Sequence, residues 1–480
     1  MAITIESIIH ELKKHGVSQA KAKEVYNAYI IANRIHDGVI RQSGEPYITH
    51  PLNVANNVLK MEVYDPDTVS GALLHDTIED AFFDYRKQDI ATSINPTVAE
   101  LVDGVTKMKG MEFSNKEEKE AANTRKIING LSKDIRIIVI KLADRLHNMS
   151  TIEWKSPQKQ KENAAETLEI FVPVAIKIGA YQVKNELEEL SLKYLYPEVY
   201  KEISERRELI TEKQRPELEM MAERIQEELK EKGITNDIVF RNRSIYTLFN
   251  DIKSGYKIDN IFDLSYFKVL LETEDDCYIT LGVVHRQNTP VNERFKDYFS
   301  APRGFYQSLH TTVLDPNGNF KKVKIRTYDM DKRDAFGLIA DLNKGRSMED
   351  IQKEFREKWF DMKLQKIDDT FKDNREFVKT VKSDLLSEEI YVYGTKGGIT
   401  IPKGSTAFDF VCEILSMEEI NNLTSIIVNG KEVEKDQELK NNDRVQVVCE
   451  GKIKDEDLSK SATTEKAKLM VKKMKHEDTE

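Results

Sequence analysis

The hydrophobic pattern of the chain changes near residue 237, and this change constrains the fold more than any other feature. From residue 1 to about 195, apolar residues recur at spacings of three and four, as they do across residues 25–30. This period predicts amphipathic helices. Beyond residue 237, β-type runs such as 267–271 and 322–326 alternate with helical segments. We therefore expect an all-α bundle followed by a mixed α/β domain.

Four further segments follow from composition. Residues 196–232 are rich in Glu, Lys and Arg and predict a solvated linking helix. Residues 346–386 return to charged helix, and a small β-rich unit begins at Glu389. The tail from Lys452 to Glu480 is almost wholly polar, so we expect it to be disordered or loosely helical.

Size and charge exclude several classes of protein. A chain of 480 residues is long enough for about three domains. Its net charge of −10 argues against general binding to nucleic acids or anionic membranes. The three cysteines are widely spaced and form no CxxC pair, which argues against a thiolate zinc site and a disulfide framework. We see no signal peptide and no apolar run of transmembrane length, so we expect a cytoplasmic protein without a membrane partner.

The stretch Leu74–Asp80 indicates the chemistry of the N-terminal region. A His-Asp doublet, His75-Asp76, stands one helical turn before a Glu-Asp doublet and follows an apolar run. In one continuous helix, positions i and i+4 share a face, so each member of the first doublet would lie over its counterpart in the second. Four polar, mostly anionic groups on a buried helix are costly without a cation. The stretch therefore predicts a divalent metal with acid/base chemistry beside it.

Two other segments complete this predicted site. His50 precedes a proline at a predicted helix start, and Asp144 follows the apolar run 137–142. With His75 and Asp76 they offer two imidazoles and two carboxylates, which suit Mn²⁺ with bound waters better than closed tetrahedral zinc. A bound metal lowers the pKa of water, and the Glu-Asp doublet stands where a general acid/base and a water-positioning group are needed. A lone His-Asp pair is common by chance, whereas these segments in this order are far more specific.

These segments carry a family resemblance, in RQSGEPYITHP at 41–51, LLHDTIED at 73–80 and KLADRLHNM at 141–149. They resemble the hydrolase domain of the RelA/SpoT-homologue family, of the long bifunctional Rel type. Enzymes of that family make and destroy the guanosine alarmones ppGpp and pppGpp, and their HD domain is a helical bundle that uses Mn²⁺. The resemblance implies that this chain hydrolyses the 3′-pyrophosphate of (p)ppGpp in the stringent response.

The resemblance also assigns a role to individual residues. Gln42 stands where the family usually has lysine, which would weaken one phosphate contact. For Arg145 and His147 we expect helix-surface or supporting roles. By motif, the metal ligands would be His50, His75, Asp76 and Asp144. Glu79 and Asp80 would handle the attacking water. The nucleotide pocket would be lined by Arg41, Ser43, Asn148 and Thr151.

The central domain resembles the pyrophosphokinase domain of the same family. Residues 292–298 and 306–311 match its RFKDY and YQSLHT motifs. The nucleotide site implied by this resemblance comprises Arg241 and Arg243 for the ATP phosphates, Asp263 as the first metal-binding acid, Tyr306 to stack on guanine, and Gln307 and His310 to hold the GDP or GTP acceptor.

Several positions of this domain depart from the family pattern. Lys322 occupies the place of the second metal-binding glutamate, and a cation there reverses the sign of the local field. Lys268 replaces an arginine, Asp251 a basic residue, and Asp341-Leu342 a His-Trp pair. We therefore predict that pyrophosphokinase activity is absent or severely reduced, with Mg²⁺ needed only if some synthesis remains. The retained residues then form either a sensor of GDP, GTP or alarmone, or a packing scaffold, and we weight these two interpretations equally.

The last unit resembles a TGS domain, a small β-grasp module, over residues 389–398 and 401–410. The glycines of the first segment lie in a predicted hairpin turn, so a turn is favoured over a phosphate cradle. In long Rel proteins this module precedes regulatory parts that contact the ribosome. We find no such parts here and do not expect ribosome coupling in its usual form.

The expected fold is multidomain, α and α/β. The leading hypothesis is an Mn²⁺-dependent guanosine-3′,5′-bis(diphosphate) 3′-pyrophosphohydrolase that forms GDP or GTP and pyrophosphate. The alternatives are a bifunctional enzyme with weak synthesis and a non-catalytic guanine-nucleotide regulator. The expected divisions are an HD hydrolase domain at 1–195, a helical linker at 196–232, a degenerate nucleotidyltransferase-like synthetase domain at 233–345, a helical connector at 346–386, a TGS domain at 387–450 and a polar tail at 451–480.

Overall fold

The computed structural model divides the chain into two compact units, Met1–Met111 with Lys126–Trp359 and Glu112–Arg125 with Phe360–Glu480. No helix among the described residues is both long and apolar enough to cross a membrane. The residues described are 3–81, 85–106, 118, 121–122, 125, 134–300, 306–343, 347–355, 389–395, 397–449, 458–464, 466–468, 470–471 and 474.

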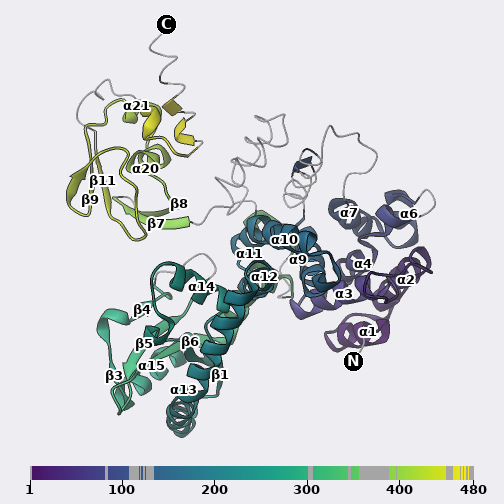
Figure 1. The fold of residues 1–480 in the computed structure, drawn as a ribbon, viewed down its shortest axis with the longest axis horizontal. Helices are drawn as coiled ribbons and strands as arrows, with labels where there is room; N and C mark the ends of the chain where they lie inside the picture. Colours follow the sequence, from purple (N-terminus) through teal and green to yellow (C-terminus); the bar gives the residue numbers. More distant parts are fainter. Residues whose placement is uncertain are drawn as a thin grey trace. The chain divides into compact units, whose positions relative to one another are not determined.

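The first unit begins with a helical bundle (Figure 1). Its helices are α1 (Ile5–Lys14), α2 (Gln19–Ile35), α3 (Thr49–Lys60), α4 (Pro66–Leu74), α5 (Thr77–Asp80), α6 (Lys87–Ser93), α7 (Pro96–Val105), α9 (Ile135–Ser150), α10 (Pro157–Glu166), α11 (Val172–Lys177) and α12 (Tyr181–Leu195). Asp65, Asn95 and Asp134 each accept a hydrogen bond from a first-turn backbone N–H, which satisfies groups that a helix leaves unpaired. Helix α9 is the centre of the bundle, because it is buried continuously from Ile135 to Ala143 and packs against α3, α4, α7 and α12. The predicted all-α region is confirmed.

The stretch Leu74–Asp80, which contains the His-Asp and Glu-Asp doublets, is not one helix. The prediction of one continuous helix with both doublets on the same face was therefore wrong. Helix α4 ends at Leu74, whose carbonyl accepts a hydrogen bond from the Thr77 hydroxyl at 2.6 Å. Asp76 has φ −100° and ψ −5°, and it precedes the single turn of α5. The two doublets therefore lie on separate turns and not on one continuous helix.

The second half of the first unit is built on a six-stranded mixed sheet of order β1-β2-β6-β5-β3, with β4 paired to β5. Strands β2 and β6 are parallel, and the other pairs are antiparallel. The predicted β-type runs 267–271 and 322–326 lie in β2 and β6, which confirms the α/β domain. The elements are α13 (Pro197–Glu231), β1 (Asn236–Asn242), α14 (Ile245–Lys253), β2 (Ser265–Leu271), α15 (Glu274–Gln287), β3 (Thr289–Pro290), β4 (Lys296–Asp297), β5 (Leu309–Leu314), β6 (Phe320–Thr327) and α16 (Tyr328–Phe336).

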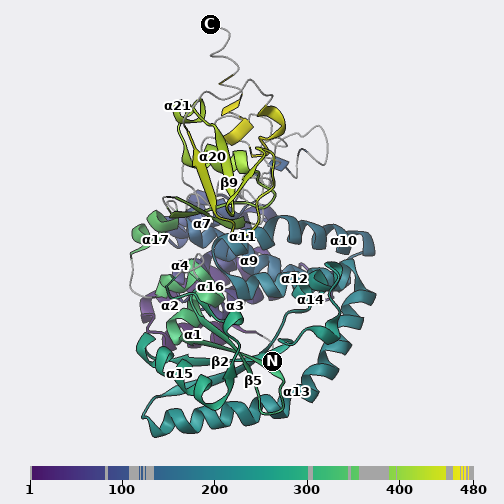
Figure 2. The same ribbon diagram turned by 90° about the vertical axis from the view of Figure 1, so that its left-hand side faces the viewer.

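One face of this sheet forms a core with α13 and α15 (Figure 2). Phe267 on β2 and Val323 on β6 are fully buried in it, and α13 contributes residues from Leu218 to Leu229. The prediction of a solvated linker at 196–232 was therefore wrong for the second half of α13. Its apolar residues recur at helical spacing and cover the sheet.

The sheet domain joins the bundle through the segment after α16. The 3₁₀ segment η5 (Gly337–Asn343) begins with Gly337 at φ +56°, and the N–H of Leu338 donates to the Ile178 carbonyl at 3.0 Å. Helix α17 (Met348–Phe355) follows, and its Gln352 side chain accepts a hydrogen bond from the Ile135 N–H at 3.0 Å. The rest of the predicted connector at 346–386 lies outside the described residues.

The second unit contains the predicted small β-rich module. A two-stranded ladder, β7-β8, and a three-stranded ladder of order β10-β9-β11 are linked by a parallel bridge between Tyr393 and Arg444. Phe408 and Phe410 on α20 are fully buried in its core. The elements are β7 (Glu389–Gly394), β8 (Gly397–Pro402), α20 (Ala407–Ile414), α21 (Met417–Ile420), β9 (Ser425–Val428), β10 (Lys431–Val433), β11 (Val445–Val448) and η7 (Leu458–Lys460).

Part of the polar tail packs on this module, so the expected loose tail was wrong for these residues. Leu458 and Val471 are buried in the same core as α20. The carboxylate of Asp409, which is fully buried, accepts hydrogen bonds from the N–H groups of Thr463 and Thr464, both at 3.0 Å. A buried carboxylate needs such donors, and here the tail supplies them.

We predict that Gly337→Ala strongly destabilises the first unit. A Cβ at this position would lie 1.8 Å from the Ile178 backbone oxygen, in a left-handed conformation that already costs alanine about 1 kcal/mol. Gly318→Ala is the matched control, because Gly318 has φ +80° and nothing within 4 Å of its added Cβ. Urea unfolding should give a clearly larger loss for Gly337→Ala, and equal losses would contradict the packing at Ile178.

Candidate metal centre

The structure brings the four predicted metal ligands close together, and three of them, His50, His75 and Asp76, have ligand atoms that all lie within 4.8 Å of one another. His50 lies in the first turn of α3, His75 and Asp76 lie between α4 and α5, and Asp144 lies in α9. The two imidazole Nε2 atoms are 3.1 Å apart, and Asp76 Oδ2 lies 3.1 Å from His75 Nε2 and 3.5 Å from His50 Nε2. Asp144 Oδ1 lies 3.3 Å and 3.8 Å from the same two nitrogens. Donors bound at about 2.0–2.2 Å to one cation lie roughly 3–3.5 Å apart, so this spacing fits a divalent cation.

The hydrogen bonds of the two imidazoles set their tautomers. His75 Nδ1 donates to the Ala72 carbonyl at 2.8 Å, which leaves a lone pair on Nε2. His50 Nδ1 lies 2.7 Å from His147 Nδ1, and that His147 atom also faces the Arg41 guanidinium at 3.5 Å. Because arginine only donates, His147 Nδ1 is an acceptor and His50 Nδ1 carries the proton. When both rings are neutral, as metal ligation requires, the two Nε2 lone pairs therefore face the centre.

The electrostatics of the centre favour a cation. Burial would lower the pKa of His75, but its attraction to Asp76 raises that pKa to about 9. Burial would raise the pKa of Asp76 and of Asp144, but the neighbouring imidazoles hold both pKa values below the ordinary range. Burial and repulsion from His50 lower the pKa of His147 to about 3, which agrees with its role as a neutral acceptor. Both carboxylates therefore stay ionised and can serve as anionic ligands.

Two side chains orient the carboxylates. The Tyr47 hydroxyl donates to Asp76 Oδ2 at 2.7 Å, and Asn148 Nδ2 donates to Asp144 Oδ1 at 2.5 Å. The sequence analysis placed Asn148 in the nucleotide pocket and did not select Tyr47. The only signal for Tyr47 was its position three residues before His50 in the same motif.

The other predicted hydrolase residues surround the centre to different degrees. Arg41 Nη2 donates to the Thr151 hydroxyl at 3.4 Å, so these two residues meet beside His147. Ser43 donates to Glu45 within its own turn, at 3.5 Å. Arg145 instead pairs with Glu166 at 2.9 Å and lies over the Phe171 ring, which supports the expected structural role.

The predicted acid/base doublet lies on α5, beside a histidine that the sequence analysis missed. Asp80 Oδ2 is 3.9 Å from Nδ1 of His36, whose side chain is fully buried and whose ring packs on Tyr47 with centroids 4.5 Å apart. Burial lowers the pKa of His36 to about 4. Glu79 lies half-buried on the same turn. His36, Tyr47 and Asp76 thus connect α5 to the metal centre.

The predicted synthetase-like residues are held in ion pairs. Asp263 contacts Lys322 Nζ at 2.7 Å and Arg243 Nη1 at 2.9 Å, and Arg243 also reaches Asp251 at 2.7 Å. Arg241 is exposed and donates to its neighbour's carbonyl. The side chains that were expected to serve a metal and phosphates therefore neutralise one another.

The predicted acceptor-site residues are partly assembled. The Tyr306 hydroxyl lies 2.5 Å from His310 Nε2 and accepts a hydrogen bond from Arg326 Nη2 at 2.9 Å. Gln307 lies half-buried beside them. Burial and the neighbouring cations, of which Lys324 has the largest effect, lower the pKa of His310 to about 2, so this imidazole is neutral.

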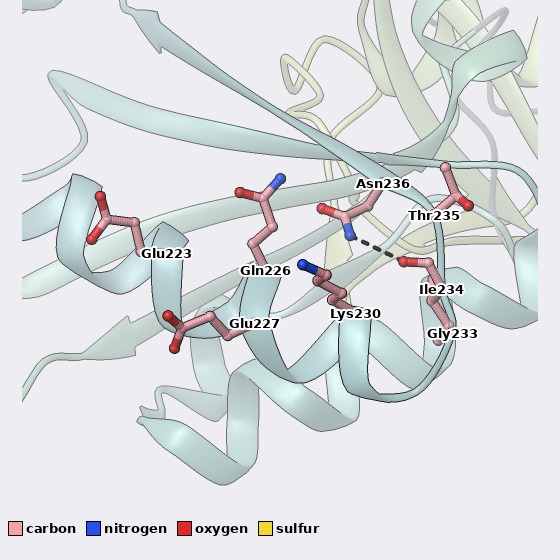
Figure 3. A pocket seen from close by; sticks show the side chains of 8 residues that line it. All are labelled: Glu223, Gln226, Glu227, Lys230, Gly233, Ile234, Thr235 and Asn236. Carbon is pink, nitrogen blue, oxygen red and sulfur yellow. Dashed lines mark hydrogen bonds between the residues drawn. The ribbon is translucent and has the colours of Figure 1, made fainter.

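A solvent-open groove of about 690 Å³ lies elsewhere, between the end of α13 and the start of β1 (Figure 3). The hydrogen bond drawn there runs from Asn236 Nδ2 to the Ile234 carbonyl at 3.2 Å. Its charged side chains, such as Glu223 and Lys230, are exposed and do not converge on a point. This groove is not our candidate site.

Comparison with known families gives three matches along the chain. Residues 28–181 match the HD domain, residues 240–347 match the region found in RelA/SpoT proteins, and residues 390–449 match the TGS domain. The class defined by the fold and the metal centre is thus an HD-domain protein with a RelA/SpoT region and a TGS domain.

Curated relatives agree with this class. The chain is 36% identical over 430 residues to a GTP pyrophosphokinase of Myxococcus xanthus, covering 88% of the chain and 56% of the relative. It is 35% identical over 411 residues to a guanosine-3′,5′-bis(diphosphate) 3′-pyrophosphohydrolase of Vibrio cholerae (84% and 57%). It is 36% identical over 406 residues to the bifunctional (p)ppGpp synthase/hydrolase SpoT of Escherichia coli (84% and 57%). The chain belongs to the RelA/SpoT family, as its motifs predicted, and it spans little more than half the length of these relatives.

We predict that Tyr47→Phe weakens Mn²⁺ binding by roughly tenfold. The variant keeps the ring against His36 but removes the hydroxyl that orients Asp76, and the loss of such a supporting hydrogen bond typically costs 10- to 100-fold in metal affinity or activity. Tyr26→Phe is the control, because Tyr26 is exposed on α2. Titration with Mn²⁺ followed by electron paramagnetic resonance measures both. Equal affinities would contradict the orienting role of Tyr47.

Proposed function

We propose that the chain hydrolyses the 3′-pyrophosphate of ppGpp and pppGpp, with Mn²⁺ held by His50, His75, Asp76 and Asp144. The observation that carries this proposal is the proximity of those four donors, which come from α3, from the turn between α4 and α5, and from α9, with both imidazole Nε2 atoms directed to one position. Relatives of the chain bear the names of (p)ppGpp hydrolases, which supports the choice of substrate.

We assign different chemical roles to the residues around the centre. When bound, a divalent cation supplies Lewis acidity and lowers the pKa of water. We assign Glu79 and Asp80 the transfer of the proton from the attacking water. Arg41, with Thr151 beside it, is placed to contact a phosphate, and charge-assisted hydrogen bonds make arginine well suited to that role. We assign Ser43 and Asn148 to the same nucleotide pocket.

We further propose that synthesis of (p)ppGpp is lost. In the synthetase-like domain, Lys322 stands 2.7 Å from the Asp263 carboxylate that a divalent cation would need. Phosphoryl transfer depends on metal ions that bridge the phosphates, and an ammonium group at this point repels them. A bifunctional enzyme with slow synthesis is the second candidate, since relatives carry the name GTP pyrophosphokinase.

Two assays separate the alternatives. Purified protein with labelled ppGpp and Mn²⁺ should release pyrophosphate, whereas ATP with GDP and Mg²⁺ should give no ppGpp. Formation of ppGpp in the second assay would overturn the loss of synthesis. No turnover in either assay would favour a non-catalytic regulator.

His75→Ala and Asp144→Ala should each lower hydrolysis by at least about a thousandfold, since each removes a donor from the centre. His10→Ala is the control, because His10 is exposed on α1. Circular dichroism checks that each variant is folded. Retained hydrolysis in a folded His75→Ala protein would contradict the assignment of the metal ligands.

Lys322→Glu alone should not restore synthesis. The variant supplies the missing carboxylate, but Asp251 still pairs with Arg243, and Lys268 still pairs with Asp331 at 2.5 Å. The measurement is ppGpp formation from ATP and GDP with Mg²⁺. Robust synthesis by the single variant would show that one substitution, and not several together, silences the domain.

A further inference from the structure

The face of the sheet opposite its apolar core carries a row of cations. Alternate residues of a strand point to opposite faces, and Phe267 and Val323 point into the core. Their neighbours Lys268 and Lys324 pair across β2 and β6 and therefore share the other face. We call this the cationic face and define it by Arg241, Lys268, Lys322, Lys324 and Arg326.

Most of these cations already have an acidic partner. Lys322 pairs with Asp263 at 2.7 Å, Lys268 pairs with Asp331 at 2.5 Å, and Arg326 pairs with Asp334 at 2.5 Å. Lys324 differs: among the described residues no carboxylate oxygen lies within 4.0 Å of its Nζ. Its ammonium lies over the Tyr266 ring, 4.6 Å from the centroid, and 5.9 Å from that of Tyr306. Among the described residues, Lys324 and the exposed Arg241 are thus the two cations of the face without an acidic partner, and Lys324 is the one held between aromatic rings.

Burial makes the positive charge of Lys324 energetically unfavourable. Burial and repulsion from Arg326 and Lys322 lower the pKa of Lys324 to about 7. A cation in such surroundings is stabilised by an anion that reaches it. The positive potential of the face thus favours a ligand with several negative charges.

The same contacts exclude a divalent cation from this face. Both Asp263 oxygens are engaged, Oδ2 by Lys322 and Oδ1 by Arg243 at 2.9 Å. An ammonium and a guanidinium thus stand where a divalent cation would have to bind that carboxylate. Anionic phosphates would have to be neutralised by the lysines themselves.

We propose that the cationic face binds the diphosphate group of a nucleotide or free pyrophosphate without a divalent cation, with Lys322 and Lys324 as the neutralising charges. This proposal rests on the proposed loss of synthesis. Under this proposal the domain binds an anion without a metal ion and no longer carries out metal-dependent catalysis. Tyr306, held by His310 and Arg326, lies next to the face and offers an aromatic surface to a base.

Isothermal titration of the full chain in EDTA tests the proposal, with pyrophosphate, GDP and ADP as separate ligands. EDTA also keeps the hydrolase centre free of metal, so this experiment is independent of hydrolysis. We expect binding in EDTA that does not increase when Mg²⁺ is present in excess. Binding that appears only with Mg²⁺, or no binding of any ligand, would overturn the proposal and leave the hydrolase assignment untouched.

Variants locate the site. Lys324→Gln should weaken binding by about 10- to 100-fold, as expected for the loss of a hydrogen bond to a charged group, whereas Lys324→Arg should keep most of it. Lys257→Gln is the control, because Lys257 is exposed and is not one of the residues of the cationic face. Equal affinities for Lys324→Gln and the unaltered chain would overturn the assignment to this face. Tighter binding of GDP than of ADP identifies a guanine nucleotide as the source of the diphosphate, and equal binding of all three ligands identifies phosphate recognition alone.

Binding should also depend on pH through Lys324. The anion prefers the charged ammonium, so affinity should fall as pH rises through about 7, and it should fall less in Lys324→Arg. The ligand's own titration is common to both proteins and cancels in the comparison. An identical pH profile for the two proteins would contradict the role of Lys324. The charged or titratable groups around this lysine are Lys322 and Arg326 on β6, Tyr266 and Lys268 on β2, His310 on β5, Lys296 on β4, Asp331 and Asp334 on α16, and Tyr306.

Discussion

Two half-buried carboxylates against two buried imidazoles are the constraint on which the N-terminal bundle depends. Asp76 and Asp144 come from different helices, and removing either charge from water is costly unless opposite charge or donors meet it. His50 and His75 supply that compensation, and Tyr47, Asn148 and His147 in turn orient the ligands. Helix α9 is central and buried, since it carries Asp144 and packs against α3, which carries His50, and against α4, which His75 and Asp76 follow.

In the synthetase-like domain, lysine and arginine side chains of the protein itself neutralise the acid that would otherwise be available to a metal ion. A metal site keeps its acids available for a cation, whereas here Lys322 and Arg243 occupy both oxygens of Asp263. Such pairing neutralises a carboxylate that metal-assisted phosphoryl transfer would need, which is the basis of the proposed loss of synthesis. Among the described residues, the cations without an acidic partner are then Arg241 and Lys324, on the face of the sheet opposite the apolar core.

Much of the fold and the residues of the candidate metal centre were predictable from local sequence. The periods of apolar residues placed the helices and β2 and β6, and the family motifs contain the four proposed ligands, which the structure brings close together. Two errors arose where a contact distant in sequence decides the outcome: the sheet buries the second half of α13, and Asp409 with the core of α20 holds part of the tail. The end of α4 at Leu74 is a local break in the helix, which the spacing of the doublets did not indicate.

By itself, the sequence determined which chemical groups the protein has: two histidines and two acids in family motifs, and a lysine where a glutamate is usual. Those choices are local and can be recognised residue by residue. Only the tertiary structure decided which groups meet, such as His147 with His50, Tyr47 with Asp76, and Lys322 with Asp263. The physical reason is that an ion pair or a tautomer depends on atoms within a few ångströms, and helix packing and strand register bring those atoms together from distant parts of the chain.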